Sequence, residues 1–172
     1  MGERTDRTVE VVPYRDEWPA AFETVRRALA AAVGEVAISI EHIGSTAVPG
    51  LSAKPTIDIL MVVEAPEQFL GVLGRVEELG FDYREHNTFV GSEDHLFLRK
   101  VENGKRTHHL HVVRAGSPEI EGYRRFRDAL RRDHVLAREY ETVKLDLAAA
   151  YGSDRVRYVE AKSAWIDDRL GS

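Results

Sequence analysis

The spacing of apolar residues along the chain predicts a strand-rich first part and an all-helical last part. Short apolar runs bounded by Gly, Pro and Asn are typical of strands, which we expect at 36–40, 56–63, 81–84, 95–101 and 107–114. Apolar residues at helical spacing predict helices at 18–33 and 66–79, with Asp16 as the N-cap of the first and a glycine after each. From Pro118 onward the helical period persists, and we expect helices over 119–132, 134–151 and 154–170.

This order of elements predicts an α+β fold, in which a mixed sheet with flanking helices is followed by a helical C-terminal part. The pair Asn103-Gly104 favours a tight hairpin turn between the last two strands. No linker is evident, so we expect a single domain over residues 1–172, with the sheet core at about 9–116 and the helical part at about 117–172.

Composition narrows the classes of protein that the chain can belong to. The chain has 172 residues, 24 Lys and Arg against 29 Asp and Glu, and a net charge of −5. Because nucleic acid is itself negatively charged, this net negative charge argues against nucleic acid as a partner. No run approaches the roughly 18 apolar residues of a membrane span, and the N-terminus lacks the apolar region of a secretion signal. We therefore expect a cytoplasmic protein without a membrane partner. Because cysteine is absent, thiolate metal sites and thiol nucleophiles are excluded.

The long loop at 41–51 is the first candidate site. Gly44 and Ser45 follow a strand and, with Thr46, offer free backbone N–H groups and hydroxyls of the kind that hold phosphate. Lys54 could add a positive charge. The alternative is an ordinary connection in which Gly and Pro serve turns.

Asp58 and a histidine cluster are the next candidates. Asp58 lies inside an apolar strand, where a carboxylate needs a charged partner, hydrogen bonds or a metal; the alternative is a cap at the strand's start. His109 and His111 share one face of their strand and can bind a divalent metal or contact a phosphate. The alternative for this pair is one exposed and one hydrogen-bonded core histidine.

In the predicted C-terminal helices, ring-bearing and basic residues recur four positions apart. Tyr140 with Lys144, Tyr158 with Lys162, and Arg127 with Arg131 each share a helix face. A face with Tyr and Lys could bind a ring and a phosphate, whereas the alternative is a solvated face.

The stretch IEHIGSTAVPGLSAKPTIDI resembles the signature of the GrpB family, which is placed in the nucleotidyltransferase fold superfamily. The resemblance runs over nearly the whole chain and includes PYRDEWPAAFE, HHLHVV, RFRDALR and the Tyr158/Lys162 pair. It implies a nucleotidyltransferase-type sheet. Family members are also similar to a domain fused to dephospho-CoA kinase in some bacteria, which implies a link to coenzyme A metabolism.

The resemblance to the wider superfamily implies a Gly-Ser pair in a loop that holds the triphosphate. It also implies three carboxylates that bind two divalent metals. Carried over to this chain, Gly44 and Ser45 match the loop and Asp58 matches the first acid. Leu60 occupies the second acid position and cannot bind a metal, and His109 or His111 would replace the third acid. The resemblance thus implies an atypical site for one metal (Mn, Zn or Mg) at Asp58, His109 and His111, with His42 or Glu41 as a further ligand.

Together these observations predict a protein that binds a nucleotide or another phosphorylated small molecule, with metal-dependent nucleotidyl or phosphoryl transfer by Asp58, His109 and His111. The predicted phosphate contacts are Gly44, Ser45, Thr46, Lys54, Arg127, Lys144 and Lys162. The alternative, favoured by Leu60, is a catalytically degenerate module that senses a ligand or supports a partner enzyme.

Overall fold

The computed structural model describes residues 9–83 and 93–171. Its centre is one mixed sheet in the order β1-β2-β5-β4-β3. The strands are β1 (Ala37–Ile43), β2 (Ile57–Val63), β3 (Phe81–Tyr83), β4 (His95–Glu102) and β5 (Lys105–Arg114). Neighbours are antiparallel except for β2 and β5, which run parallel. The predicted α+β class with a mixed sheet is therefore confirmed.

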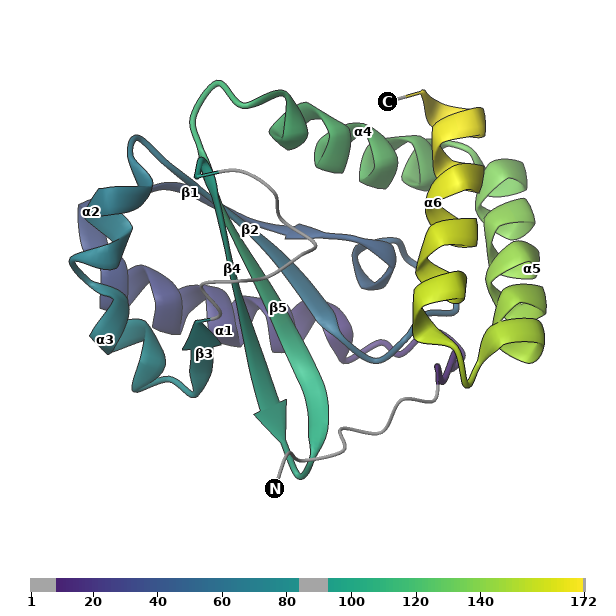
Figure 1. The fold of residues 1–172 in the computed structure, drawn as a ribbon, viewed down its shortest axis with the longest axis horizontal. Helices are drawn as coiled ribbons and strands as arrows, with labels where there is room; N and C mark the ends of the chain where they lie inside the picture. The colour runs from purple at the N-terminus through teal and green to yellow at the C-terminus, as the bar shows by residue number, and fades with distance from the viewer. Residues whose placement is uncertain (1–8, 84–92, 172) are drawn as a thin grey trace.

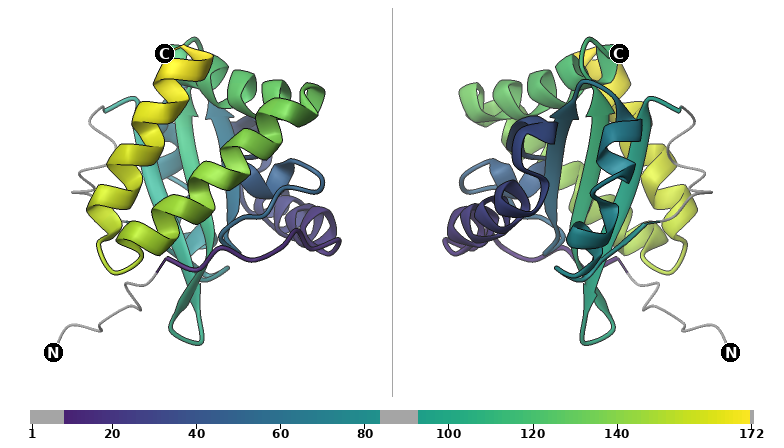
Figure 2. Two further views of the ribbon diagram at one scale, coloured as in Figure 1. Left: turned by 90° about the vertical axis from the view of Figure 1, so that its right-hand side faces the viewer. Right: turned by 90° about the vertical axis from the view of Figure 1, so that its left-hand side faces the viewer.

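Helices cover both faces of this sheet (Figures 1 and 2). On one face lie α1 (Trp18–Val33), α2 (Pro66–Leu70) and α3 (Leu73–Glu77). On the other lie α4 (Pro118–Arg132), α5 (His134–Tyr151) and α6 (Arg155–Leu170), with α5 and α6 side by side. No helix within residues 9–83 and 93–171 has the length and apolar character needed to cross a bilayer.

The alternation of strand residues divides the core into two layers. On β2, Ile59 and Met61 face α1 and belong to the largest apolar cluster. Leu60 and Val62 face the other way and pack with Ile120 of α4 in a second cluster. Asp58 shares this second face, because side chains two residues apart on a strand point to the same side. The candidate site therefore lies between the sheet and the C-terminal helices.

Local differences from the predicted elements have identifiable causes. The helix predicted at 66–79 is broken into α2 and α3 after Gly71, because Val72 leaves the helical dihedral region and glycine propagates a helix poorly. The N-cap of α1 is Glu17 rather than Asp16, and no side chain caps it. The strand predicted at 36–40 extends to Ile43. Arg84, predicted to end β3, lies outside the described residues.

Candidate functional site

Asp58 and His109 stand side by side on the face that α4 and α6 cover. In the parallel pair of β2 and β5, Asp58 lies opposite His109 and Leu60 lies opposite His111. His109 Nδ1 is 2.9 Å from Asp58 Oδ1. Burial raises the pKa of the Asp58 carboxyl, but the hydrogen bond with His109, with His111 and Lys162 nearby, outweighs burial and lowers it. When an ionised Asp58 accepts the Nδ1–H, the ring nitrogen that remains for other interactions is His109 Nε2.

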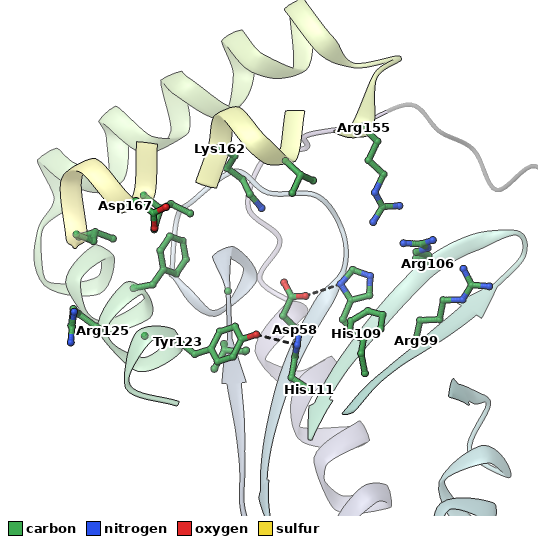
Figure 3. Close-up of a pocket in the computed structure, with 18 of the residues that line it drawn as sticks. Asp58, Arg99, Arg106, His109, His111, Tyr123, Arg125, Arg155, Lys162 and Asp167 are labelled. Carbon is green, nitrogen blue, oxygen red and sulfur yellow. Dashed lines mark hydrogen bonds and ion pairs between the residues drawn. The ribbon is translucent and has the colours of Figure 1, made fainter. Parts of the chain in front are cut away.

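A cavity of about 750 Å³ opens above this pair, between the sheet and helices α4 and α6 (Figure 3). Phe97, Tyr123 and Phe126 give it an aromatic wall. Its charged lining consists of the cations Arg99, Arg106, Arg125, Arg155 and Lys162 and the carboxylates Asp58 and Asp167. Five cations against two carboxylates give this part of the described surface a positive balance, although the whole chain carries −5. The cavity can therefore attract an anion.

A smaller cavity of about 130 Å³ adjoins the first and shares its residues Asp58, His109 and Lys162. Ser45, Thr46, Lys54 and Lys144 also line it. Burial lowers the pKa of Lys54 to about 8 and that of Lys144 to about 7. The structure thus brings together three of the predicted lysines with the predicted loop hydroxyls.

Gly44 allows the loop to pass directly over Asp58. Its φ of 74° lies in the left-handed region, and a Cβ added there would be 2.6 Å from Asp58 Oδ2. The next residues form the short turn Ser45–Ala47, in which Ser45 hydrogen-bonds the Tyr140 side chain. The predicted Gly-Ser element therefore lies against the predicted acid, in agreement with the sequence pattern.

Replacing Gly44 with alanine is expected to lower the free energy of unfolding by about 1–2 kcal/mol, because the new Cβ meets Asp58 in a strained conformation. Urea denaturation measures this change. Gly74→Ala is the matched control, since an added Cβ meets nothing within 4 Å there and its φ is not positive. Equal stability of both variants would contradict the proposed close approach.

Two predicted residues, His42 and Arg127, line neither cavity. His42 stacks on Phe22 of α1 at 4.7 Å between ring centroids, on the opposite face of the sheet, and its Nε2 is 2.9 Å from Thr46 Oγ1. Arg127 binds Glu41 Oε2 at 3.1 Å and the His42 carbonyl at 3.2 Å. The structure therefore does not bring His42 to Asp58, and it gives Arg127 protein partners between α4 and the sheet edge.

His111 enters the site as part of a hydrogen-bonded chain rather than beside Asp58. His95 Nε2 is 3.0 Å from His111 Nδ1, and His95 Nδ1 is 2.5 Å from Glu119 Oε2. The Tyr123 hydroxyl is 3.2 Å from the same His111 nitrogen. Burial lowers the pKa of His111 to about 3. With Glu119 accepting the hydrogen bond from His95 Nδ1–H, His95 Nε2 accepts the hydrogen bond from His111 Nδ1–H, and this chain, with the Tyr123 hydroxyl against the same nitrogen, fixes the orientation of the His111 ring.

The residues missed by the sequence analysis are chiefly Arg99, Arg155 and Tyr123. Arg99 lies two residues after Phe97 on β4 and therefore on the same face of the strand. The hairpin register places Arg99 opposite His109. Arg155 precedes Lys162 by seven residues, a spacing that shares a helix face. Both spacings can be seen in the sequence. They indicate the cavity only when the register of the strands and the orientation of the helix are known.

The described residues do not fit a resident divalent metal. Among residues 9–83 and 93–171, no group of three or more His, Asp and Glu side chains could hold a metal ion. Asp58 Oδ1 is engaged by His109, and Leu60, which the resemblance would place at the second acid position, is fully buried and cannot bind a metal. The metal at Asp58, His109 and His111 stays a prediction without support from this geometry.

Comparison with known proteins shows the family. The model of the family described as "GrpB protein" matches residues 8–171. The chain is 34% identical over 160 residues to protein YqkA of Bacillus subtilis, covering 93% of this chain and 46% of the relative, so it spans about half of that protein. It is 32% identical to the glutamate-rich protein GrpB of Alkalihalophilus pseudofirmus, with 94% of each chain covered. It is 29% identical to a dephospho-CoA kinase of Mycobacterium bovis, covering 92% of this chain and 44% of the kinase.

Solved structures agree with the sequence comparisons. The crystal structure of the conserved protein GrpB from Enterococcus faecalis matches with a TM-score of 0.84 and 36% identity, over 92% of this chain and 93% of that one. Cid1 in complex with its short product ApU matches with a TM-score of 0.52 and 14% identity, over 78% of this chain and 42% of that one, and so supports the nucleotidyltransferase-like fold alone. The chain therefore belongs to the GrpB family.

Proposed function

We propose that the chain binds a phosphorylated small molecule, with a nucleotide as the favoured class, in the cavity between the sheet and α6. The observation that carries this proposal is that the cavity is basic although the chain is acidic. The net charge of the chain is −5, whereas the described residues that line this cavity include five cations and two carboxylates. Burying cations together is costly unless an anion joins them. A phosphate supplies that anion, and arginine binds it with several N–H groups at once.

The cavity also has room and surface for the rest of a nucleotide. Its volume of about 750 Å³ lies within the range of small-molecule sites. Phe97, Tyr123 and Phe126 offer aromatic surface on which a base can stack. The adjoining small cavity, with Lys54, Lys144 and Lys162, favours the placement of the phosphates there. In this arrangement Ser45 and Thr46 lie within the same phosphate region.

Replacing Arg155 with glutamine is expected to weaken nucleotide binding by about tenfold, the cost of one charge-assisted hydrogen bond. Calorimetry with the four ribonucleoside triphosphates, and with the matching nucleosides, measures this effect. Arg157→Gln is the control. Arg157 belongs to the same helix, pairs with Asp154 and lines neither cavity. The proposal fails if none of the triphosphates binds more tightly than its nucleoside.

A second candidate is a non-catalytic module that binds a coenzyme A precursor or supports an enzyme that makes one. Two features favour it: Leu60 stands where the resemblance implies a metal-binding acid, and a relative with 29% identity is named dephospho-CoA kinase. Dephospho-CoA added to the same calorimetric panel distinguishes the two. Binding of dephospho-CoA at least tenfold tighter than any triphosphate would favour the second candidate.

A further inference from the structure

We propose that His109 is a nucleophile: its Nε2 takes a phosphoryl or nucleotidyl group from a bound nucleoside triphosphate, with Asp58 holding the opposite ring nitrogen. The proposal rests on the nucleotide binding proposed above and adds a covalent step to it. It assigns Asp58 to the imidazole of His109 rather than to a metal ion.

The first observation is an unsatisfied ring nitrogen. His109 Nε2 is buried and has no hydrogen-bond partner among the described residues, whereas Nδ1 is 2.9 Å from Asp58 Oδ1. Buried polar atoms without a partner are rare in native proteins and each needs an explanation, of which a catalytic role is one. A carboxylate that accepts one ring N–H fixes the tautomer in which the other nitrogen carries the lone pair. Asp58 therefore keeps His109 Nε2 ready to form a bond.

The second observation is the charge around this ring. Arg106 and Arg155 lie on the side of His109 away from Asp58 in Figure 3, and both line the same cavity as Arg99 and Lys162. His109 Nε2 is buried from solvent. An entering phosphate therefore has to displace a neighbouring side chain before it reaches this nitrogen. Arginine side chains are long and are attracted to phosphate, so they can move with it. The same cations then stabilise the charge of the transferred group.

The other imidazole of the cavity lacks this arrangement. His111 Nδ1 contacts His95 and Tyr123, and the residue opposite His111 on β2 is Leu60. Among the described residues, the hydrogen bonds of His111 therefore go to His95 and Tyr123 and not to a carboxylate, unlike that of His109 to Asp58. This difference selects His109 as the attacking residue.

The step balances as a displacement at phosphorus. The Nε2 lone pair forms a P–N bond, and the phosphoanhydride P–O bond breaks with its electrons leaving on pyrophosphate or on the nucleoside diphosphate. The imidazole keeps its Nδ1 proton and becomes cationic, and the Asp58 carboxylate stabilises that charge. Water or an acceptor alcohol then attacks phosphorus and loses its proton to solvent. The P–N bond breaks, and the lone pair returns to Nε2.

The test is to trap the phosphorylated histidine. The protein is mixed with each ribonucleoside triphosphate in the presence of a chelator and quenched in alkaline denaturant, in which phosphoimidazoles survive. Intact and peptide mass spectrometry then locates the added group. We expect one phosphoryl or nucleoside monophosphate group on His109, none in His109→Gln, and an unchanged yield in His134→Gln, which removes an exposed histidine of α5.

A second variant separates the chemistry from folding. Asp58→Asn is expected to bind the triphosphate but to form the adduct about 100-fold more slowly, the loss typical for one preorganised electrostatic group. Binding without any adduct, or an adduct on another histidine, would overturn the nucleophile proposal and leave the nucleotide site standing. If no triphosphate binds, the proposed function and the nucleophile both fall.

Discussion

Replacing Leu60 with aspartate is expected to destabilise the fold by roughly 4 kcal/mol instead of completing a metal site, because it would bury a charge whose polar neighbour across β5, His111, is already hydrogen-bonded to His95 and Tyr123. Leu60 is fully buried in the cluster of Ile43, Val62, Val113 and Ile120 beneath α4. These apolar side chains cannot pair with a carboxylate. The loss is a large part of the 5–15 kcal/mol that typically stabilises a domain, so the variant should unfold at a clearly lower urea concentration than the wild type.

Urea denaturation of Leu60→Asp, with and without Mn²⁺, measures this expectation. Leu60→Met is the control, since it keeps the volume and apolar character of the side chain and should cost less than about 1.5 kcal/mol. A Leu60→Asp variant that keeps wild-type stability without metal would contradict the buried-charge argument, and one whose stability Mn²⁺ restores would show that this position can serve a metal. In that case the assignment of Asp58 to His109 would lose its support.

The sequence predicted the elements and the faces of the strands better than it predicted which side chains meet. The alternation in HHLHVV placed His109 and His111 on one face, and the loop pattern identified Gly44 and Ser45. The structure confirms these faces, because side-chain alternation in a strand depends only on local backbone geometry. The pairing of Asp58 with His109 depends on strand order and on the parallel register, which local periodicity does not contain.

Arg127 and Lys162 show the same limit on the helices. Both are basic residues with a partner four positions away, and nothing in their sequence spacing separates them. In the structure Lys162 faces the cavity, whereas Arg127 binds Glu41 and a backbone carbonyl. The helix periods fixed which residues share a face, but only the packing of α4 and α6 on the sheet decides which face meets the site.

Lys144 is expected to make the stability of the fold rise with pH between about 7 and 9. Burial, with Lys162 nearby, lowers its pKa from 10.5 to about 7, although Glu141 acts in the opposite direction. Between these two values the unfolded chain holds the proton and the folded chain does not, so the free energy of unfolding increases with pH by up to about 1.4 kcal/mol per unit. Below pH 7 both states hold the proton, and the full cost of burying the charge remains.

Urea denaturation of the wild type and of Lys144→Met at pH 7 and pH 9 isolates this contribution, because the other ionisable groups are common to both proteins. The wild type should gain about 2–3 kcal/mol relative to the variant over this interval. A nucleoside triphosphate in the small cavity would raise the pKa of Lys144, since an anion favours the ammonium form. The ligand should therefore reduce the pH dependence and be bound with proton uptake at pH 8. An unchanged slope with saturating ligand would indicate that the phosphates do not lie beside Lys144.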